Sequence, residues 1–147
     1  MEANPPLRFC EAIDKVFRQN YANFNGRARR SEYWFWYLFN ILVESVLFLP
    51  AQVFKFQQGQ IPVVLTVMYY IYIGFFIITF IPGLAVTVRR LHDIGKSGWW
   101  ILIVFIPFVG AIILLVFTCF DSEHGPNEWG DSPKYTVTNL GNQETMV

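Results

Sequence analysis

The chain alternates polar stretches with apolar runs that are too long for the core of a small soluble domain. From Ile61 to Val88 there are 28 residues without a charge, and from Gly98 to Phe120 there are another 23. A helix needs about 20 mostly apolar residues to cross a bilayer, whereas a buried helix of a soluble protein has an apolar run of about 10 to 14 residues. The pattern therefore predicts an all-α, polytopic membrane protein.

Three membrane segments are predicted, at residues 33–49, 61–88 and 98–120. The first begins with aromatic residues, which are typical of the headgroup level, and a polar loop from Pro50 to Gln60 follows it. As one helix, the second would be roughly 42 Å long against a bilayer core of about 30 Å. We therefore expect a kink or break at Pro82 and Gly83, because proline removes a backbone hydrogen bond.

The third apolar run contains Pro107 and Gly110 near its middle. These residues either kink a single span or turn the chain back as a re-entrant hairpin with two arms of about 15 Å each. A turn at membrane depth is tolerated only where protein buries it, so the single span is preferred. That choice leaves the tail after Phe120 on the periplasmic side.

The first predicted element, Leu7 to Phe24, is an amphipathic helix. Its apolar residues recur at helical spacing, and its charged residues occupy the other side. Such a helix lies in the membrane interface or packs over the inner ends of the spans, and the two roles are compatible. Residues 1–133 are expected to form one membrane domain, followed by a disordered tail at 134–147.

Composition strengthens the membrane assignment, because only 15% of the residues are charged, against about 25% in soluble proteins. The formal net charge of zero gives no indication of a nucleic-acid partner. Cys10 and Cys119 form neither a disulfide framework nor a zinc site, and His92 and His124 are too few and too separated for a metal site. No cofactor motif is present, and the N-terminus lacks the apolar region of a cleaved signal peptide.

The cations predict the orientation of the chain. Arg27, Arg29 and Arg30 precede the first span; Arg89, Arg90 and Lys96 follow the second; the loop between those spans contains only Lys55. Because cytoplasmic loops carry an excess of Lys and Arg, the N-terminus and the segment from Arg89 to Trp100 are expected in the cytoplasm.

Four segments carry a resemblance to a known family: NFNGRARRSEYWFW, PGLAVTVRRLHDIGKSGWW, IPFVGAIILL and GPNEWGDSP. In order and spacing, the chain resembles the YhaH/YhaI-like family of small bacterial inner-membrane proteins, a domain of unknown function. The resemblance implies a bacterial cytoplasmic membrane location and a compact helical domain. It carries over no catalytic residue, because that family has no established activity.

The basic runs are the first candidate site. Arginine matches the geometry of phosphate, so Arg27, Arg29, Arg30, Arg89, Arg90 and Lys96 are candidates for binding an anionic lipid headgroup. Glu32, His92 and Asp93 are polar candidates beside them, and we expect the two basic runs to approach each other with Glu32 or Asp93 neutralising part of the charge. The alternative is a topology determinant with local pairing, in which Arg89 meets Asp93 at i,i+4 and His92 bonds to backbone.

Glu44 is the second candidate, a carboxylate about eleven residues into the first span. An intramembrane carboxylate indicates proton coupling or substrate binding. In the alternative, the first span ends early, and Glu44 lies near the outer interface beside a polar partner such as Gln52, Thr66 or a tyrosine.

These features favour a non-enzymatic structural or interaction protein whose basic cytoplasmic loops contact anionic lipid or a partner protein. One alternative is a small transporter that uses Glu44, which requires a homo-oligomer because three spans enclose little interior. A weaker alternative is a lipid-modifying enzyme at His92 and Asp93, for which no nucleophile is evident.

Overall fold

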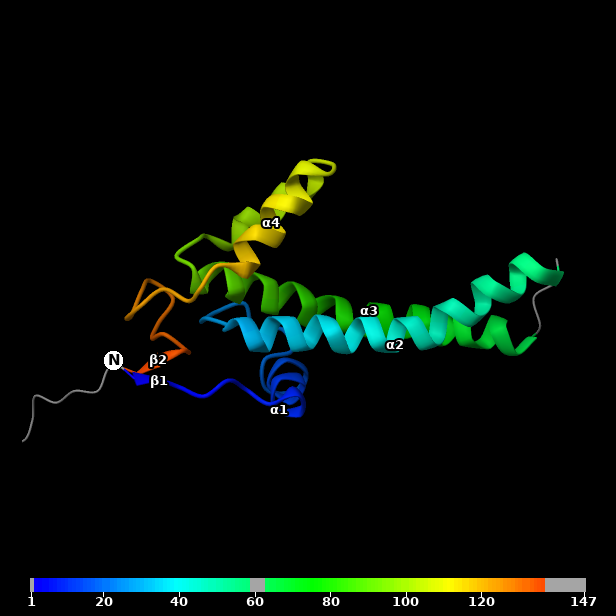
Figure 1. Cartoon of the computed structure of the whole chain (residues 1–147), viewed down its shortest axis with the longest axis horizontal. Coiled ribbons are helices and arrows are strands. Elements are labelled where there is room, and N and C mark those ends of the chain that lie inside the picture. The colour runs from blue at the N-terminus through cyan, green and yellow to red at the C-terminus, as the bar shows by residue number, and fades with distance from the viewer. Residues whose placement is uncertain (1, 59–62, 137–147) are drawn as a thin grey trace, which may run out of the picture.

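The computed structural model describes residues 2–58 and 63–136, and its frame is a long helical hairpin (Figure 1). The two arms are α2 (Arg30–Gln58) and α3 (Val63–Asp93). Before them come strand β1 (Glu2–Ala3), α1 (Phe9–Asp14) and a π-helical turn, η1 (Lys15–Gln19). After them come a 3-10 helix, η2 (Gly98–Phe105), then α4 (Val109–Cys119) and strand β2 (Tyr135–Thr136). The predicted helical class is confirmed.

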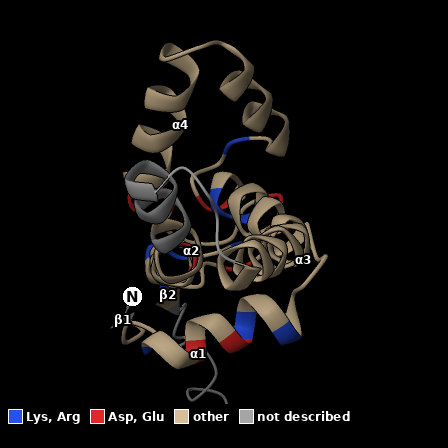
Figure 2. Cartoon of the chain, turned by 90° about the vertical axis from the view of Figure 1, so that its right-hand side faces the viewer, with Lys and Arg blue, Asp and Glu red and all other residues tan. Residues whose placement is uncertain are grey.

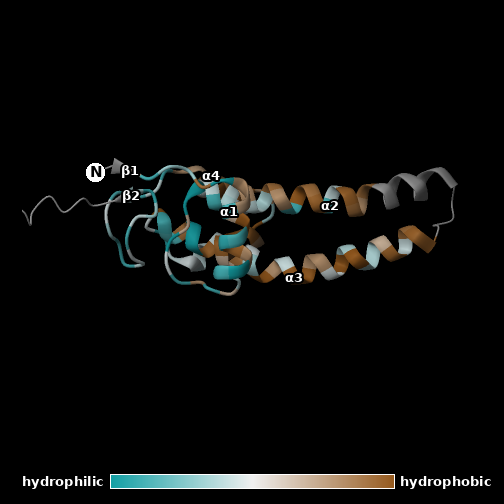
Figure 3. Cartoon of the chain, turned by 90° about the horizontal axis from the view of Figure 1, so that it is seen from below, coloured by the Kyte–Doolittle hydropathy of each residue, from teal (hydrophilic) through white to brown (hydrophobic). Residues whose placement is uncertain are grey.

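The helices expose large apolar side chains over most of their length. Val63 is 80% exposed and Phe108 is 86% exposed, although a soluble monomer rarely exposes large contiguous apolar patches. Figure 3 shows this apolar character along both arms, with the hydrophilic residues gathered at the end that carries α1 and the strands. Within the described ranges, α3 is the one helix long and apolar enough to cross a membrane, and α4 is a shorter apolar helix.

The predicted boundaries of the first two segments need correction. The polar loop expected from Pro50 onward is helical, since α2 continues to Gln58. Of the kink or break expected at Pro82 and Gly83, the break is wrong, because α3 runs through both residues and ends only at Asp93. The basic residues from Arg89 to His92 are therefore in the last turns of a helix and not in a connecting loop.

A hydroxyl group from the N-terminal region compensates for Pro82 inside α3. Proline has no N–H, so the carbonyl of Ile78, four residues earlier, loses its helical donor. The Tyr21 hydroxyl donates to that carbonyl at 2.7 Å. A buried or membrane-facing carbonyl without a partner is costly, and this contact removes the reason for the helix to break.

The third apolar run is a hairpin, so the preferred single span is wrong. η2 ends at Phe105, the chain turns through Ile106, Pro107 and Phe108, and α4 returns alongside η2 (Figure 1). Proline disfavours a helical conformation in the residue before it, and Ile106 is extended with φ −84° and ψ 108°. Gly110 allows the two arms to meet, because a Cβ atom there would lie 1.7 Å from the carbonyl oxygen of Ile103.

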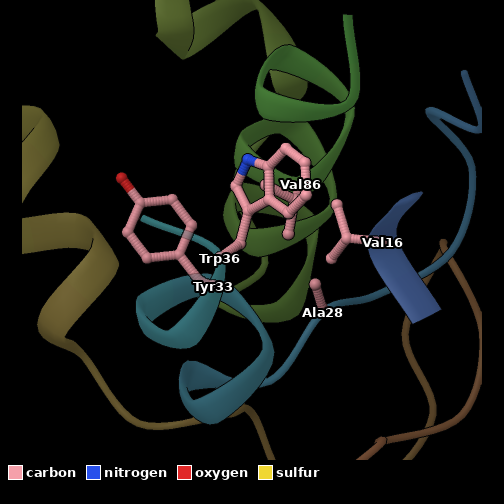
Figure 4. Packing of buried hydrophobic residues seen from close by; sticks show 5 residues of the cluster. All are labelled: Val16, Ala28, Tyr33, Trp36 and Val86. Atoms are coloured by element: carbon pink, nitrogen blue, oxygen red, sulfur yellow. The ribbon is translucent and has the colours of Figure 1, made fainter. Parts of the chain in front are cut away.

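The N-terminal helix is shorter than predicted, because helical structure ends at Gln19 and not at Phe24. It packs on the start of the α2–α3 hairpin, where Val16, Ala28, Tyr33, Trp36 and Val86 form a buried cluster (Figure 4). The ring of Phe17 also stacks on Trp36, with centroids 6.1 Å apart. This is the packing role expected for the element.

The tail lies beside the N-terminus, which corrects the prediction that the two are on opposite sides. β1 pairs antiparallel with β2, with Ala3 opposite Tyr135. Asn4 also donates its backbone N–H to the Lys134 carbonyl at 2.8 Å. Residues 134–136 of the expected disordered tail are thus ordered, and residues 137–147 lie outside the described part.

The hairpin predicts a large difference between two glycine substitutions. Gly110→Ala is expected to lower the free energy of unfolding by at least about 1–3 kcal/mol, because the new methyl group overlaps the Ile103 carbonyl. Gly74→Ala in α3 is the control, since no atom lies within 4 Å of its new Cβ. Thermal unfolding in detergent, followed by circular dichroism, measures both. Equal melting temperatures for Gly110→Ala and the wild type would contradict the close approach.

Candidate functional site

The two basic runs meet in a buried group of charged and polar side chains at the polar end of the hairpin. We call this group the ionic cluster; it comprises Arg27, Glu32, Arg89, Arg90, His92 and Asp93, each at most 7% exposed. Figure 2 shows charged residues where α2 and α3 lie together, while the η2–α4 hairpin carries none. The predicted approach of the two runs, with Glu32 and Asp93 neutralising charge, is confirmed.

Asp93 is the centre of the ionic cluster. Its carboxylate accepts from Arg27 Nε at 3.1 Å, from the Ser122 hydroxyl at 2.5 Å and from Arg90 in the last turn of α3. These donors come from the turn before α2, from the chain after α4 and from α3 itself. One carboxylate therefore joins three parts of the chain.

Arg27 and Arg90 use their remaining N–H groups on backbone carbonyls. Arg27 donates to Glu123 at 2.6 Å and to Gly125 at 2.7 Å, and Arg90 donates to Thr118 at 3.2 Å. A planar guanidinium with five donors suits such a set of acceptors. Both arginines therefore hold the segment after α4 against the end of α3.

Glu32 forms a second ion pair with Arg89, at 2.6 Å. Its other oxygen lies 2.8 Å from Lys15 of η1, which fixes the N-terminal helix to α2. The expected pair of Arg89 and Asp93 is wrong, because Arg89 turns to Glu32 and Asp93 pairs with Arg90 at i,i+3. Residues three or four apart are neighbours on a helix surface, so the spacing alone would allow either Arg89 or Arg90 to pair with Asp93. The Glu32 carboxylate on α2 attracts Arg89 and leaves Arg90 for Asp93.

His92 bonds to backbone, as expected, with Nδ1 3.2 Å from the Gly26 carbonyl. Its ring stacks on Trp129 with centroids 4.5 Å apart. Burial lowers the pKa of the imidazole, and the bond to Gly26 partly opposes that shift. His92 and Asp93 therefore have separate partners, and this geometry does not bring them together as a catalytic dyad.

The other candidate cations are nearer the surface. Arg29 donates to the Pro5 carbonyl at 2.6 Å, whereas Arg30 lies 3.0 Å from the exposed carboxylate of Asp121. The Lys96 ammonium lies 5.8 Å from the centre of the Trp100 ring. Of the six predicted cations, Arg30 and Lys96 are those that burial leaves accessible to a ligand.

A pocket of about 190 Å³ lies beside Arg30, at the start of α2. Its lining is Pro6, Arg29, Arg30, Ser31, Asp121, Ser122 and Lys134. The Ser31 hydroxyl is buried and makes no hydrogen bond within the described part. Burial alone would raise the pKa of Asp121, but hydrogen bonds from Lys134 and the Ser122 N–H, together with the charge of Arg30, lower it to about 2.

Glu44 lies in the middle of α2, which continues to Gln58, so the helix itself does not end near Glu44. The half-buried side chain faces a groove between α2 and α3. Neither Thr66 nor a tyrosine bonds to it in the part of the chain that the structure describes. Gln52 lies among the residues whose side chains are outside that part.

Sequence reasoning missed several polar contributors to the site. Lys15 pairs with Glu32, and the Ser122 hydroxyl donates to Asp93. The Asn127 side chain donates to the His92 carbonyl at 2.9 Å at the end of α3. Gly125 and Gly130, whose carbonyls accept from Arg27, belong to the GPNEWGDSP segment that carries the family resemblance. That segment was the one feature of the sequence that could have indicated these contacts.

Removing the central charge should destabilise the fold. Asp93→Asn is expected to lower the free energy of unfolding by about 3–5 kcal/mol, because it leaves the guanidinium groups of Arg27 and Arg90 buried without their counter-charge. Asp121→Asn is the control, since exposed ion pairs contribute about 0–1 kcal/mol. Denaturant titration in detergent measures both. Similar losses for the two variants would mean that Asp93 does not hold the cluster together.

A family model described as a protein of unknown function (DUF805) matches residues 21–131. This range includes α2, α3, the η2–α4 hairpin, the ionic cluster and the chain that returns to it. No solved structure matches the chain.

Two curated relatives come from Escherichia coli strain K12. "Inner membrane protein YhaI" is 39% identical over 118 residues, which are 80% of this chain and 91% of the relative. "Inner membrane protein YhaH" is 41% identical over 116 residues, which are 79% of this chain and 91% of the relative. The resemblance seen in the sequence is confirmed, and the chain belongs to the DUF805 family of bacterial inner-membrane proteins.

Proposed function

We propose that the protein is a non-catalytic lipid-contact protein of the inner membrane, and that its polar end binds the phosphate of an anionic phospholipid. The observation that carries this proposal is the pocket at the start of α2. Three cations line it, Arg29, Arg30 and Lys134, against the single carboxylate of Asp121. The excess of two positive charges attracts the single negative charge of a phosphodiester.

The polar groups of the pocket suit the same ligand. The buried Ser31 hydroxyl has no partner within the described residues, and it can donate to a phosphate oxygen. The first-turn amides of α2 lack helical acceptors and carry the positive end of the helix dipole. Together they add neutral donors to the charges of Arg30 and Lys134.

In this proposal α2 and the uncharged part of α3, residues 63–88, cross the membrane with the ionic cluster on the cytoplasmic side. The η2–α4 hairpin enters the cytoplasmic leaflet of the membrane. Its arms have 8 and 11 residues, so each is roughly 16 Å long and reaches about half of a 30 Å core. The exposed rings of Trp34, Trp99 and Trp100 then lie near the headgroups, where tryptophan is enriched.

Lipid binding is tested with the two accessible cations of the pocket. The double variant Arg30→Ala with Lys134→Ala is expected to lose affinity for phosphatidylglycerol, by about 1 kcal/mol for each cation. Native mass spectrometry of the detergent-solubilised protein measures retained lipid, with phosphatidylcholine as the comparison. Lys55→Ala removes one charge near the far end of α2, away from the pocket, and it serves as the control.

Three outcomes would overturn the lipid site: equal retention by the double variant, an equal loss in Lys55→Ala, or no preference for phosphatidylglycerol over phosphatidylcholine. Inorganic phosphate that displaces the lipid at millimolar concentration would instead identify free phosphate as the ligand.

The topology is tested with the two exposed cysteines, Cys10 and Cys119. Both are expected to resist a membrane-impermeant maleimide in intact cells and to react once the inner membrane is opened. Each is measured alone, in Cys119→Ser and in Cys10→Ser, and Lys55→Cys in a chain without the other two is the periplasmic control. Labelling of Cys119 in intact cells would show that the hairpin crosses the membrane.

A further inference from the structure

We infer that the groove between α2 and α3 around Glu44 is a binding site for an organic ammonium cation with apolar substituents. This inference is independent of the phosphate pocket, which lies at the start of α2, whereas Glu44 is fourteen residues further along the same helix. It rests on the groove, on the absence of a counter-charge for Glu44 and on the aromatic residues around it.

Two adjoining cavities meet at Glu44. One, of about 230 Å³, extends from Glu44 toward Trp36 and Gly83. The other, of about 200 Å³, extends in the opposite direction toward Phe48 and Leu49. Ile41 and Glu44 line both cavities, so the carboxylate lies in the middle of one continuous groove.

Glu44 has no hydrogen bond or ion pair with any residue of the described ranges, in contrast to Asp93. In the topology proposed above, Glu44 lies at the middle of a membrane-crossing helix. A carboxylate there is expensive without a partner, and such groups pair with one another, with backbone or with a ligand. The charge that is missing at Glu44 is therefore positive.

The neighbouring polar groups carry no charge, and several of their N–H and O–H groups already donate hydrogen bonds. Thr79 donates its hydroxyl to the Phe75 carbonyl at 2.9 Å, and Asn40 donates its amide to the Trp36 carbonyl at 2.8 Å. The Tyr37 and Thr87 hydroxyls pair with each other at 3.0 Å. The Ser45 and Tyr72 hydroxyls also line the groove, but they are neutral. Glu44 is the one charged residue among the lining residues, so the groove attracts a cation and not an anion.

The wall contributed by α3 is aromatic along its length. Tyr72, Phe76 and Phe80 follow one another at i,i+4, with ring centroids 6.4 and 6.0 Å apart. The faces of aromatic rings attract cations, and this attraction is strongest where water is excluded. The same rings contact apolar substituents. An ammonium group that carries alkyl or aryl arms therefore fits the groove better than a hydrated metal ion or a neutral lipid chain.

The test uses the full-length protein in an uncharged detergent and benzyltrimethylammonium as the probe. Equilibrium dialysis of the radiolabelled probe is expected to show one saturable site per chain above the partition into empty micelles. Neopentylbenzene, its neutral carbon isostere, is expected not to displace the probe. Glu44→Gln should weaken binding by at least about tenfold, which corresponds to 1.4 kcal/mol of lost charge attraction.

Further variants separate charge, aromatic contact and folding. Glu44→Asp keeps the charge and should retain measurable binding, and Phe80→Leu should weaken binding several-fold through the lost ring. Glu128→Gln makes the same chemical change at an exposed carboxylate and should bind like the wild type. Thermal unfolding checks that every variant is folded.

Three results would overturn the inference. They are the absence of saturable binding, equal binding by Glu44→Gln, and displacement by neopentylbenzene as strong as that by the unlabelled cation. Mass photometry on the same samples identifies one rival occupant: a dimer that dissociates in Glu44→Gln without any cation binding would show that the groove accepts a second copy of the chain.

Discussion

The structure depends on the neutralisation of the Asp93 carboxylate at the end of α3. Arg27, Arg90 and Ser122 surround it, and all the atoms involved are buried. Burying charge is favourable only when the partners are close and the remaining hydrogen-bonding groups are satisfied. Ser122 lies two residues after Phe120, the C-cap residue of α4. The third apolar run therefore has to return to the end of α3, near which it starts. A single span through that run would leave Asp93 without one donor and the arginines without their carbonyl acceptors.

Arg27 and Arg90 share the carboxylate of Asp93, and backbone carbonyls accept the other hydrogen bonds that these two arginines donate. The carbonyls of Thr118 and Phe120 accept from Arg90, and those of Glu123 and Gly125 accept from Arg27. Arg29 likewise donates to Pro5. These contacts explain how a chain with a dense basic pattern uses most of its arginines internally, and why only the cations at the edge of the cluster remain for a phosphate group.

The sequence predicted the features that depend on composition and periodicity, and it missed those that depend on distant partners. The apolar runs, the helical class and the meeting of the two basic runs followed from local pattern. The continuation of α3 through Pro82 did not, because the compensating donor is Tyr21, which lies 57 residues before Ile78, the residue whose carbonyl it bonds. The hairpin at Pro107 depends on the Gly110 contact with Ile103 and on the acceptors that Arg90 requires. Length alone favours one crossing of such a run, and these contacts reverse the choice.

Asp93 and Glu44, two of the buried or half-buried carboxylates of this helical pair, are thus in opposite circumstances. Asp93 has charged and neutral donors from three segments, so its energy is lowered by the fold itself. Glu44 has the groove and the aromatic wall but no donor among the described residues, so its charge is left for a ligand to pair. A fold that supplies every partner for one carboxylate and none for the other separates a structural charge from one that is available to a ligand. The distance along α2 between the locked polar end and Glu44 allows the groove to bind and release a cation without disturbing the contacts that keep the helices together.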